Sequence, residues 1–177
     1  YILTGATGGL GLATAKVLLA DGAKVVISSR SQDSVDRAVA DLGPNAAGIA
    51  ADNTGPQTPA RLIAAAHKTF GRLDGILISV GGPPAGPLME RTEDEWRAAF
   101  ESVFLGAIRL ATAVAPELGN DGSIAFVLST SAKMPVADLA ISNGLRPGLA
   151  MAAKTLADEL GPQGIRVNGL LPGRVDT

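Results

Sequence analysis

The sequence predicts an α/β fold in which a doubly wound parallel sheet, in strand order 3-2-1-4-5-6, carries helices on both faces. Short apolar runs alternate with longer helical segments along the whole chain, a pattern typical of parallel sheets joined by right-handed crossovers. The apolar runs are continuous rather than alternating, so the strands should be buried on both faces. Ligands of such folds bind beyond the carboxyl ends of the strands, where the strand order reverses between strands 1 and 4.

The first half of the chain supplies four strands and three helices. Apolar runs predict strands at residues 1–3, 23–28, 46–51 and 75–80. Helices are expected at residues 12–20, 32–42 and 59–70. Glycine follows each helix closely and ends it, and Ser31 is placed to cap the second one.

The second half continues the same alternation with longer helices. After a loop rich in glycine and proline at residues 81–87, Thr92 and Glu95 have the capping-box spacing and open a helix to about Ala115. A strand at residues 123–128, a helix from 138 or 139 to 160 and a strand at residues 165–171 follow. Pro147 falls inside that helix and requires local accommodation.

Composition limits the classes of function. The 177 residues suit one domain, residues 1–177, and the net charge of −2 without a basic block argues against nucleic acid as a partner. With no cysteine and one histidine, neither disulfides nor a metal site is expected. No apolar run reaches about 18 residues, so we expect no membrane helix and a cytoplasmic location. The chain starts inside the first strand without methionine, so we expect it to be part of a longer chain.

A glycine-rich turn lies between the first strand and the first helix. It reads Thr-Gly-x-x-x-Gly-x-Gly over residues 4–11, which differs from the Gly-x-Gly-x-x-Gly fingerprint. Glycine lets the backbone take positive φ and lets a ligand approach closely, and the helix that follows directs unpaired N–H groups at the turn. The turn therefore predicts a pyrophosphate site, and the absence of a following Lys-Ser/Thr pair argues against a P-loop.

These motifs together resemble the short-chain dehydrogenase/reductases, whose fold is Rossmann-like, along essentially the whole chain. The resemblance rests on residues 4–11, on Asp52 after the third strand, on residues 73–77, and on residues 165–173 with 176–177. It implies a nicotinamide cofactor and a small-molecule substrate. The implied cofactor-binding residues are Gly5, Thr7, Gly8, Gly9, Leu10, Gly11, Arg30, Ser31, Asp52, Asn53, Val80, Gly81, Arg146, Pro172, Gly173, Val175 and Thr177.

The catalytic positions depart from the family pattern. Members use a tyrosine, a lysine four residues later, a serine and usually an asparagine. Ser129 matches the serine, while Ser142 stands at the tyrosine position and Arg146 at the lysine position. Val103 stands at the asparagine position, and the only tyrosine in the chain is Tyr1.

This substitution changes the available chemistry. Hydride transfer to a carbonyl needs a proton donor at its oxygen, and serine is a far weaker acid than tyrosine. Arg146 supplies a fixed charge but cannot give up a proton. A Ser142–Arg146 pair can therefore orient and polarise a carbonyl, and needs a water to relay a proton. The alternative is that Ser142 lies on an ordinary helix face and that Arg146 is solvated or ion-paired.

The end of the second strand bears on cofactor choice. Members that prefer NAD(H) place an acid there, whereas a 2′-phosphate needs positive charge. Here Arg30 lies between Ser29 and Ser31, which predicts NADP(H) over NAD(H). The alternative is that Arg30 is merely exposed. The second basic residue that NADP(H)-preferring members often carry in the glycine turn is absent, because Gly8 stands at that position.

The expected function is an NADP(H)-dependent oxidoreductase acting on a carbonyl or alcohol through Ser129, Ser142 and Arg146. A nucleotide-binding pseudoenzyme and a non-redox lyase or isomerase remain alternatives. Trp96, Phe100 and Phe104 recur at helical spacing and predict core or subunit contacts. Family members usually associate through this helix and the one after the fifth strand, so the resemblance implies a homo-oligomer, a dimer or tetramer. Family members bind substrate largely through residues that follow the Pro-Gly segment. We expect these substrate-binding residues to lie beyond Thr177.

Overall fold

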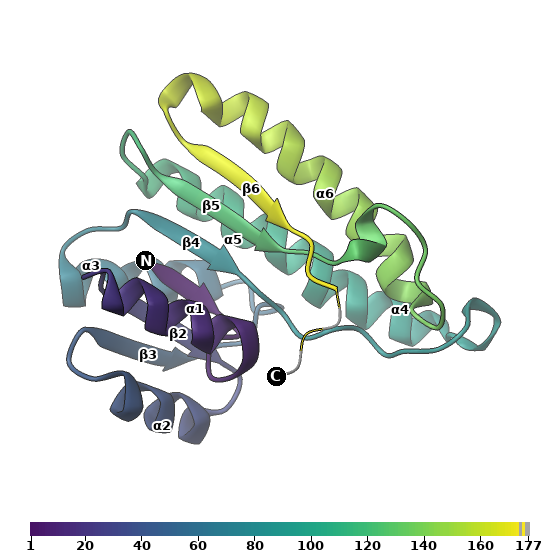
Figure 1. The fold of residues 1–177 in the computed structure, drawn as a ribbon, viewed down its shortest axis with the longest axis horizontal. Helices are drawn as coiled ribbons and strands as arrows, with labels where there is room; N and C mark the ends of the chain where they lie inside the picture. Colours follow the sequence, from purple (N-terminus) through teal and green to yellow (C-terminus); the bar gives the residue numbers. More distant parts are fainter. Residues whose placement is uncertain (174, 176–177) are drawn as a thin grey trace.

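The apolar runs form six short strands that pair in parallel in the order β3-β2-β1-β4-β5-β6, as the sequence predicts (Figure 1). The structure, a computed structural model, describes residues 1–173 and 175. The strands are β1 (Ile2–Thr4), β2 (Val25–Ser29), β3 (Ala46–Ala50), β4 (Gly75–Ile78), β5 (Ser123–Val127) and β6 (Arg166–Leu170). In β1, β2 and β4, three of the four inner strands, almost every side chain is buried, which explains why their apolar runs are uninterrupted. In the fourth, β5, buried and half-buried residues alternate.

Helices fill the intervals between strands. They are α1 (Gly9–Ala20), α2 (Gln32–Leu42), α3 (Thr58–Phe70), α4 (Glu93–Ala99), α5 (Gly106–Val114) and α6 (Ala140–Leu160). Two predicted caps are confirmed. The Ser31 hydroxyl accepts a hydrogen bond from the Ser34 N–H at 3.3 Å, and Thr92 and Glu95 form the reciprocal capping box that opens α4. Helix α6 continues through Pro147.

The helices form two layers around the sheet (Figure 1). Helices α1 and α2 pack on one face, in a cluster that includes Leu3 and Ile27. Helices α3, α5 and α6 pack on the other face, where the larger core contains Leu62, Phe126 and Leu149. The sheet is thereby held between two layers of helices. The carboxyl ends of its parallel strands all lie on the same side of the molecule.

The long helix expected to reach Ala115 is interrupted. Between α4 and α5 the backbone becomes a π-helix, η2 (Phe100–Leu105), before a 3-10 turn, η3 (Ala115–Glu117). The helical stretch Glu93–Glu117 is long and apolar enough to cross a membrane by length and composition alone. Its buried side chains, however, include Leu110 and Val114 of the main core, and this packing accounts for its apolar composition.

Two close approaches fix this helix against its neighbours. A Cβ on Gly144 of α6 would lie 2.6 Å from the Trp96 ring, so the helices meet without an intervening side chain. Gly106 begins α5 directly against the segment that follows β3, since its Cβ would lie 2.6 Å from the Asn53 carbonyl oxygen.

Gly106→Ala should therefore lower the free energy of unfolding by about 1–3 kcal/mol, because the methyl group must displace backbone rather than a flexible side chain. Gly119→Ala is the matched control, since a Cβ there would meet no heavy atom within 4 Å. Urea unfolding of both variants checks the difference. Equal midpoints for the two variants would contradict it.

Candidate active site

Two adjoining cavities open at the carboxyl ends of the strands, where the chain order reverses between β1 and β4. Their volumes are about 450 Å³ and about 430 Å³. They share the lining residues Gly5, Ser79, Val80, Gly81 and Gly82. The two cavities thus form one continuous cleft that passes over the glycine turn.

The glycine turn requires glycine at several positions. Gly5 and Gly9 have φ values of +59° and +52°, in the left-handed region. A Cβ on Gly11 would lie 2.6 Å from the Gly5 carbonyl oxygen, so glycine there lets α1 pack directly onto the turn. Gly8, the N-cap of α1, offers no side chain to bond the first N–H groups of the helix. These N–H groups are therefore available to an anion.

Thr4 couples the two central strands at the floor of the cleft. Its hydroxyl donates to the Ser79 carbonyl oxygen at 2.8 Å and accepts from the Ser79 N–H at 2.9 Å. These two hydrogen bonds hold the end of β4 beside the end of β1. The segment from Val80 to Gly82 consequently borders both cavities.

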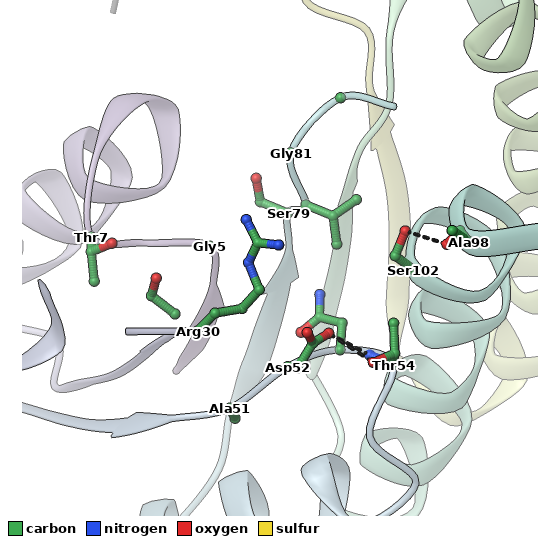
Figure 2. A pocket seen from close by; sticks show the side chains of 14 residues that line it. Gly5, Thr7, Arg30, Ala51, Asp52, Thr54, Ser79, Gly81, Ala98 and Ser102 are labelled. Atoms are coloured by element: carbon green, nitrogen blue, oxygen red, sulfur yellow. Dashed lines mark hydrogen bonds between the residues drawn. The ribbon is translucent and has the colours of Figure 1, made fainter. Parts of the chain in front are cut away.

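The first cavity brings together predicted residues from four strand ends (Figure 2). Arg30 extends into the middle of this view, with Thr7 on one side and Asp52 on the other. The Asp52 carboxylate accepts from the N–H and the hydroxyl of Thr54 at 2.9 and 3.0 Å, which fixes its orientation. Gly5, Asn53, Val80 and Gly81 also line this cavity. Ser31 does not, because its hydroxyl caps α2, and Ser29 lines the cavity instead.

The second cavity gathers the three predicted catalytic residues, which come from β5 and α6. Ser129, Ser142 and Arg146 line it together with Gly9, Leu10, Pro172, Gly173 and Val175. Thr177 lies outside the described residues. Of the other predicted cofactor residues, Gly8 and Gly11 shape the turn beneath the cleft and do not line it.

Arg146 is a buried cation in this cavity. Only 4% of the residue is exposed, and its Nη1 donates to the Val127 carbonyl oxygen at 2.6 Å. Its Nε has no hydrogen-bond partner, and no described carboxylate forms an ion pair with it. Burial lowers the pKa of Arg146 from its ordinary value. Arg146 is therefore a buried residue rather than an exposed one, its charge is not neutralised by any described carboxylate, and it borders the second cavity.

The Ser142 hydroxyl is also buried, with 6% of the residue exposed. It lies 2.9 Å from the hydroxyl of Ser131, in the 3-10 turn η4 (Thr130–Ala132). The Ser131 N–H in turn donates to the Ser129 hydroxyl at 3.2 Å. Three serines from two elements are thus connected at the end of β5.

The asparagine position of the family pattern is apolar here. Val103, in η2, is buried in a small cluster with Ala99, Ile141 and Leu145. One member of this cluster, Ile141, directly precedes Ser142 on α6. The four buried residues of the cluster are all apolar, so none of them can form a side-chain hydrogen bond with Ser142. Sequence reasoning missed Ser79, Ser102 and Ser131, of which the first two line the cleft. Ser79 directly follows the fourth strand, a position that could have signalled it.

Comparison with known proteins agrees with this geometry. The sequence profile of short chain dehydrogenases matches residues 1–177. Dehydrogenase/reductase SDR family member 4 from Oryctolagus cuniculus is 39% identical over 99% of this chain and 70% of its own length. The mitochondrial dehydrogenase/reductase SDR family member 2 from Homo sapiens is 35% identical over 99% of this chain and 65% of its own. The chain thus spans about two thirds of the length of these relatives.

Solved structures give the same result. A short-chain dehydrogenase/reductase from Brucella melitensis superposes with a TM-score of 0.94 at 30% identity, over 99% of this chain and 72% of that one. An NADPH-bound short chain oxidoreductase with an atypical catalytic center, from Pseudomonas aeruginosa PAO1, has a TM-score of 0.94 at 26% identity, over 99% and 71%. L-sorbose reductase from Gluconobacter frateurii, complexed with NADPH and L-sorbose, has a TM-score of 0.91 at 29% identity, over 97% and 68%. With the profile match across its whole length, the chain belongs to the short-chain dehydrogenase/reductase family of oxidoreductases.

Proposed function

We propose that this protein is an NADP(H)-dependent oxidoreductase that reduces a carbonyl or oxidises an alcohol. The observation that carries the proposal is the gathering of Ser129, Ser142 and the buried Arg146 in one cavity that continues over the glycine turn. Two hydroxyls and one fixed charge at the strand ends suit a polarised C=O group. Family membership supplies the reaction class.

The residues of the cleft fit a nicotinamide dinucleotide. The α1 N-terminus, without a side-chain cap, would hold the pyrophosphate, and Asp52, which lines the first cavity, would contact the adenine. Glycine at 81 and 82 leaves room in both cavities, since a Cβ at either position would meet no atom of the described residues within 4 Å. When bound, the cofactor would give or accept the hydride. Arg146 would hold the ribose beside the nicotinamide.

The protein's own groups would act on the substrate oxygen. Hydroxyl protons of Ser129 and Ser142 would donate hydrogen bonds to it, and Arg146 would stabilise the negative charge that develops there during reduction. Because arginine retains its proton and serine is a weak acid, the proton that completes the alcohol would come from water through these hydroxyls.

Arg30 supports the preference for NADP(H), because it is an exposed cation that extends into the first cavity, where Asp52 is the one acid among the described lining residues. NADPH is also the cofactor held by two of the similar structures. Arg30→Ala should weaken NADPH binding about 10- to 100-fold, the range of a charge-assisted hydrogen bond, and leave NADH binding nearly unchanged. Calorimetric titration checks this. Arg37→Ala, on the exposed side of α2, is the control, and equal losses for both nucleotides would count against the assignment.

A pseudoenzyme is the second candidate, favoured by the apolar Val103 cluster and by the absence, among the residues that the structure describes, of an acidic proton donor beside Ser142. Calorimetry with NADPH and NADH, followed by a panel of carbonyl substrates read at the nicotinamide absorbance, separates the candidates. Turnover supports the oxidoreductase, and tight binding without turnover supports the pseudoenzyme. If neither nucleotide binds, both proposals fall.

We also propose a homo-oligomer that associates through the outer surface of α4, η2 and α6. Phe100 is 44% exposed and stacks on Phe104 with ring centroids 5.2 Å apart, and Met151 of α6 is 67% exposed. We propose that these side chains belong to one contiguous apolar patch, because such patches mark protein–protein contacts. Light scattering of the full-length protein tests this, and a monomer at high concentration would contradict it.

A further inference from the structure

We propose that Ser131 is a positioning residue whose hydroxyl donates to Ser142 and thereby directs the Ser142 proton into the cleft. The inference rests on the proposed function for the role of Ser142, but its geometry is independent of it. Ser131 belongs to no motif of the sequence and does not line the cleft.

Ser131 holds both reactive hydroxyls through different groups. Its backbone N–H donates to the Ser129 hydroxyl at 3.2 Å, and its side-chain oxygen lies 2.9 Å from that of Ser142. A change of the Ser131 side chain therefore removes the contact with Ser142 and leaves the contact with Ser129 in place.

The direction of the hydroxyl pair follows from what each group can reach. Ser131 is 2% exposed, and Ser142 is the one partner of its hydroxyl among the described residues. If Ser142 donated to Ser131, the Ser131 proton would be buried without an acceptor, which is costly. If Ser131 donates, every group is satisfied, because the Ser142 proton can enter the cavity that Ser142 lines.

Other helical hydroxyls show what Ser142 would do without Ser131. Thr14, Ser102, Thr112 and Thr155 each donate to the carbonyl oxygen four residues earlier in the chain. Such back-bonding is the usual fate of a hydroxyl within a helix. It would turn the Ser142 proton onto its own helix, away from a substrate. The bond to Ser131 keeps Ser142 out of that conformation.

The kinetic test is a double-mutant cycle in the full-length protein. Ser131→Ala should lower kcat about tenfold, as expected for a misdirected proton donor, with KM and nucleotide affinity within about twofold. In the Ser142→Ala background, Ser131→Ala should have no further effect, because it acts only through Ser142. Additive losses in the cycle would overturn the proposal. Thr130→Ala, which removes an exposed hydroxyl from the same turn, is the control and should not alter kcat.

A direct measurement separates this inference from the proposed function. Neutron diffraction from deuterium-exchanged crystals locates the hydroxyl deuterons whether or not the protein turns over. Density on Ser131 pointing at the Ser142 oxygen supports the proposal, and density on Ser142 pointing at Ser131 overturns it. Wild-type protein that lacks turnover would remove the oxidoreductase assignment alone, and the neutron result would still decide the role of Ser131.

Discussion

Replacing Arg146 by methionine should lower kcat/KM of the full-length protein about 100- to 1000-fold, the usual cost of removing one charge-stabilising donor. The same change should raise the free energy of unfolding by about 1–2 kcal/mol, because a buried charge without a counter-ion is replaced by an apolar side chain of similar length. The substitution thus lowers activity and raises stability. A charge kept at the expense of stability is typical of a functional site.

Arg91→Met is a matched control for this prediction. Arg91 also has a buried Nε without a partner, but it forms an ion pair with Glu95 at 3.1 Å and lies away from the cleft. Its removal should lower stability and leave kcat/KM unchanged. If Arg146→Met instead lowered stability and left turnover intact, Arg146 would be a structural residue. Chemical denaturation and steady-state kinetics on both variants give the answer.

The lowered pKa of Arg146 sets the pH dependence of this difference. Burial disfavours the charged form in the folded state, so the destabilisation is fully present below the folded-state pKa. It is relieved only as the pH rises from that pKa toward the unfolded value. Between about pH 6 and about pH 9, where arginine stays protonated, the stability difference between wild type and Arg146→Met should be constant. A difference that varied across this window would point to another titrating group.

Gly9→Val should abolish measurable nucleotide binding, with a loss of at least about 100-fold. A side chain at its φ of +52° costs about 1–2 kcal/mol of backbone strain, and a free turn that relaxes out of this conformation would lose roughly tenfold in affinity, because binding must restore the strain. The two methyl groups would also occupy the cavity where α1 presents its N–H groups. Calorimetric titration with NADPH measures the loss.

The control for this variant is Gly161→Val, at the far end of the sheet. Gly161 has a φ of −54°, and a Cβ there would meet nothing within 4 Å. Its nucleotide affinity should equal that of the wild type. Retention of NADPH binding by Gly9→Val, with the fold intact by circular dichroism, would disprove the assignment of the turn.

The fold could be predicted because each element is specified locally. Continuous apolar runs identify buried strands, and the capping box at Thr92 and Glu95 marks a helix start that the structure confirms. The π-helix at Phe100–Leu105 could not be predicted. It arises where α5 begins, at Gly106, whose backbone meets that of Asn53 more than fifty residues earlier in the chain, and no local composition records such a contact.

The site could be predicted only in part, for the same reason. Alignment with the family pattern identified Ser129, Ser142 and Arg146, and the structure brings all three to one cavity. The pairing of Ser131 with Ser142 depends on how the loop after β5 folds back onto α6. Ser31 could serve either the helix or the cofactor by sequence, and in the structure its hydroxyl bonds the Ser34 N–H.

The contact between Trp96 and Gly144 gives the protein a built-in optical reporter. Trp96 is the single tryptophan of residues 1–177, so the tryptophan fluorescence of this stretch is assigned without mutagenesis. Its ring lies against Gly144 of α6, two residues after Ser142. The same helix carries Arg146. Any ligand that shifts α6 against α4 changes the surroundings of this one emitter, and reduced nicotinamide absorbs in the range where tryptophan emits. Quenching of a single band can therefore follow ligand binding in real time, before any substrate is known.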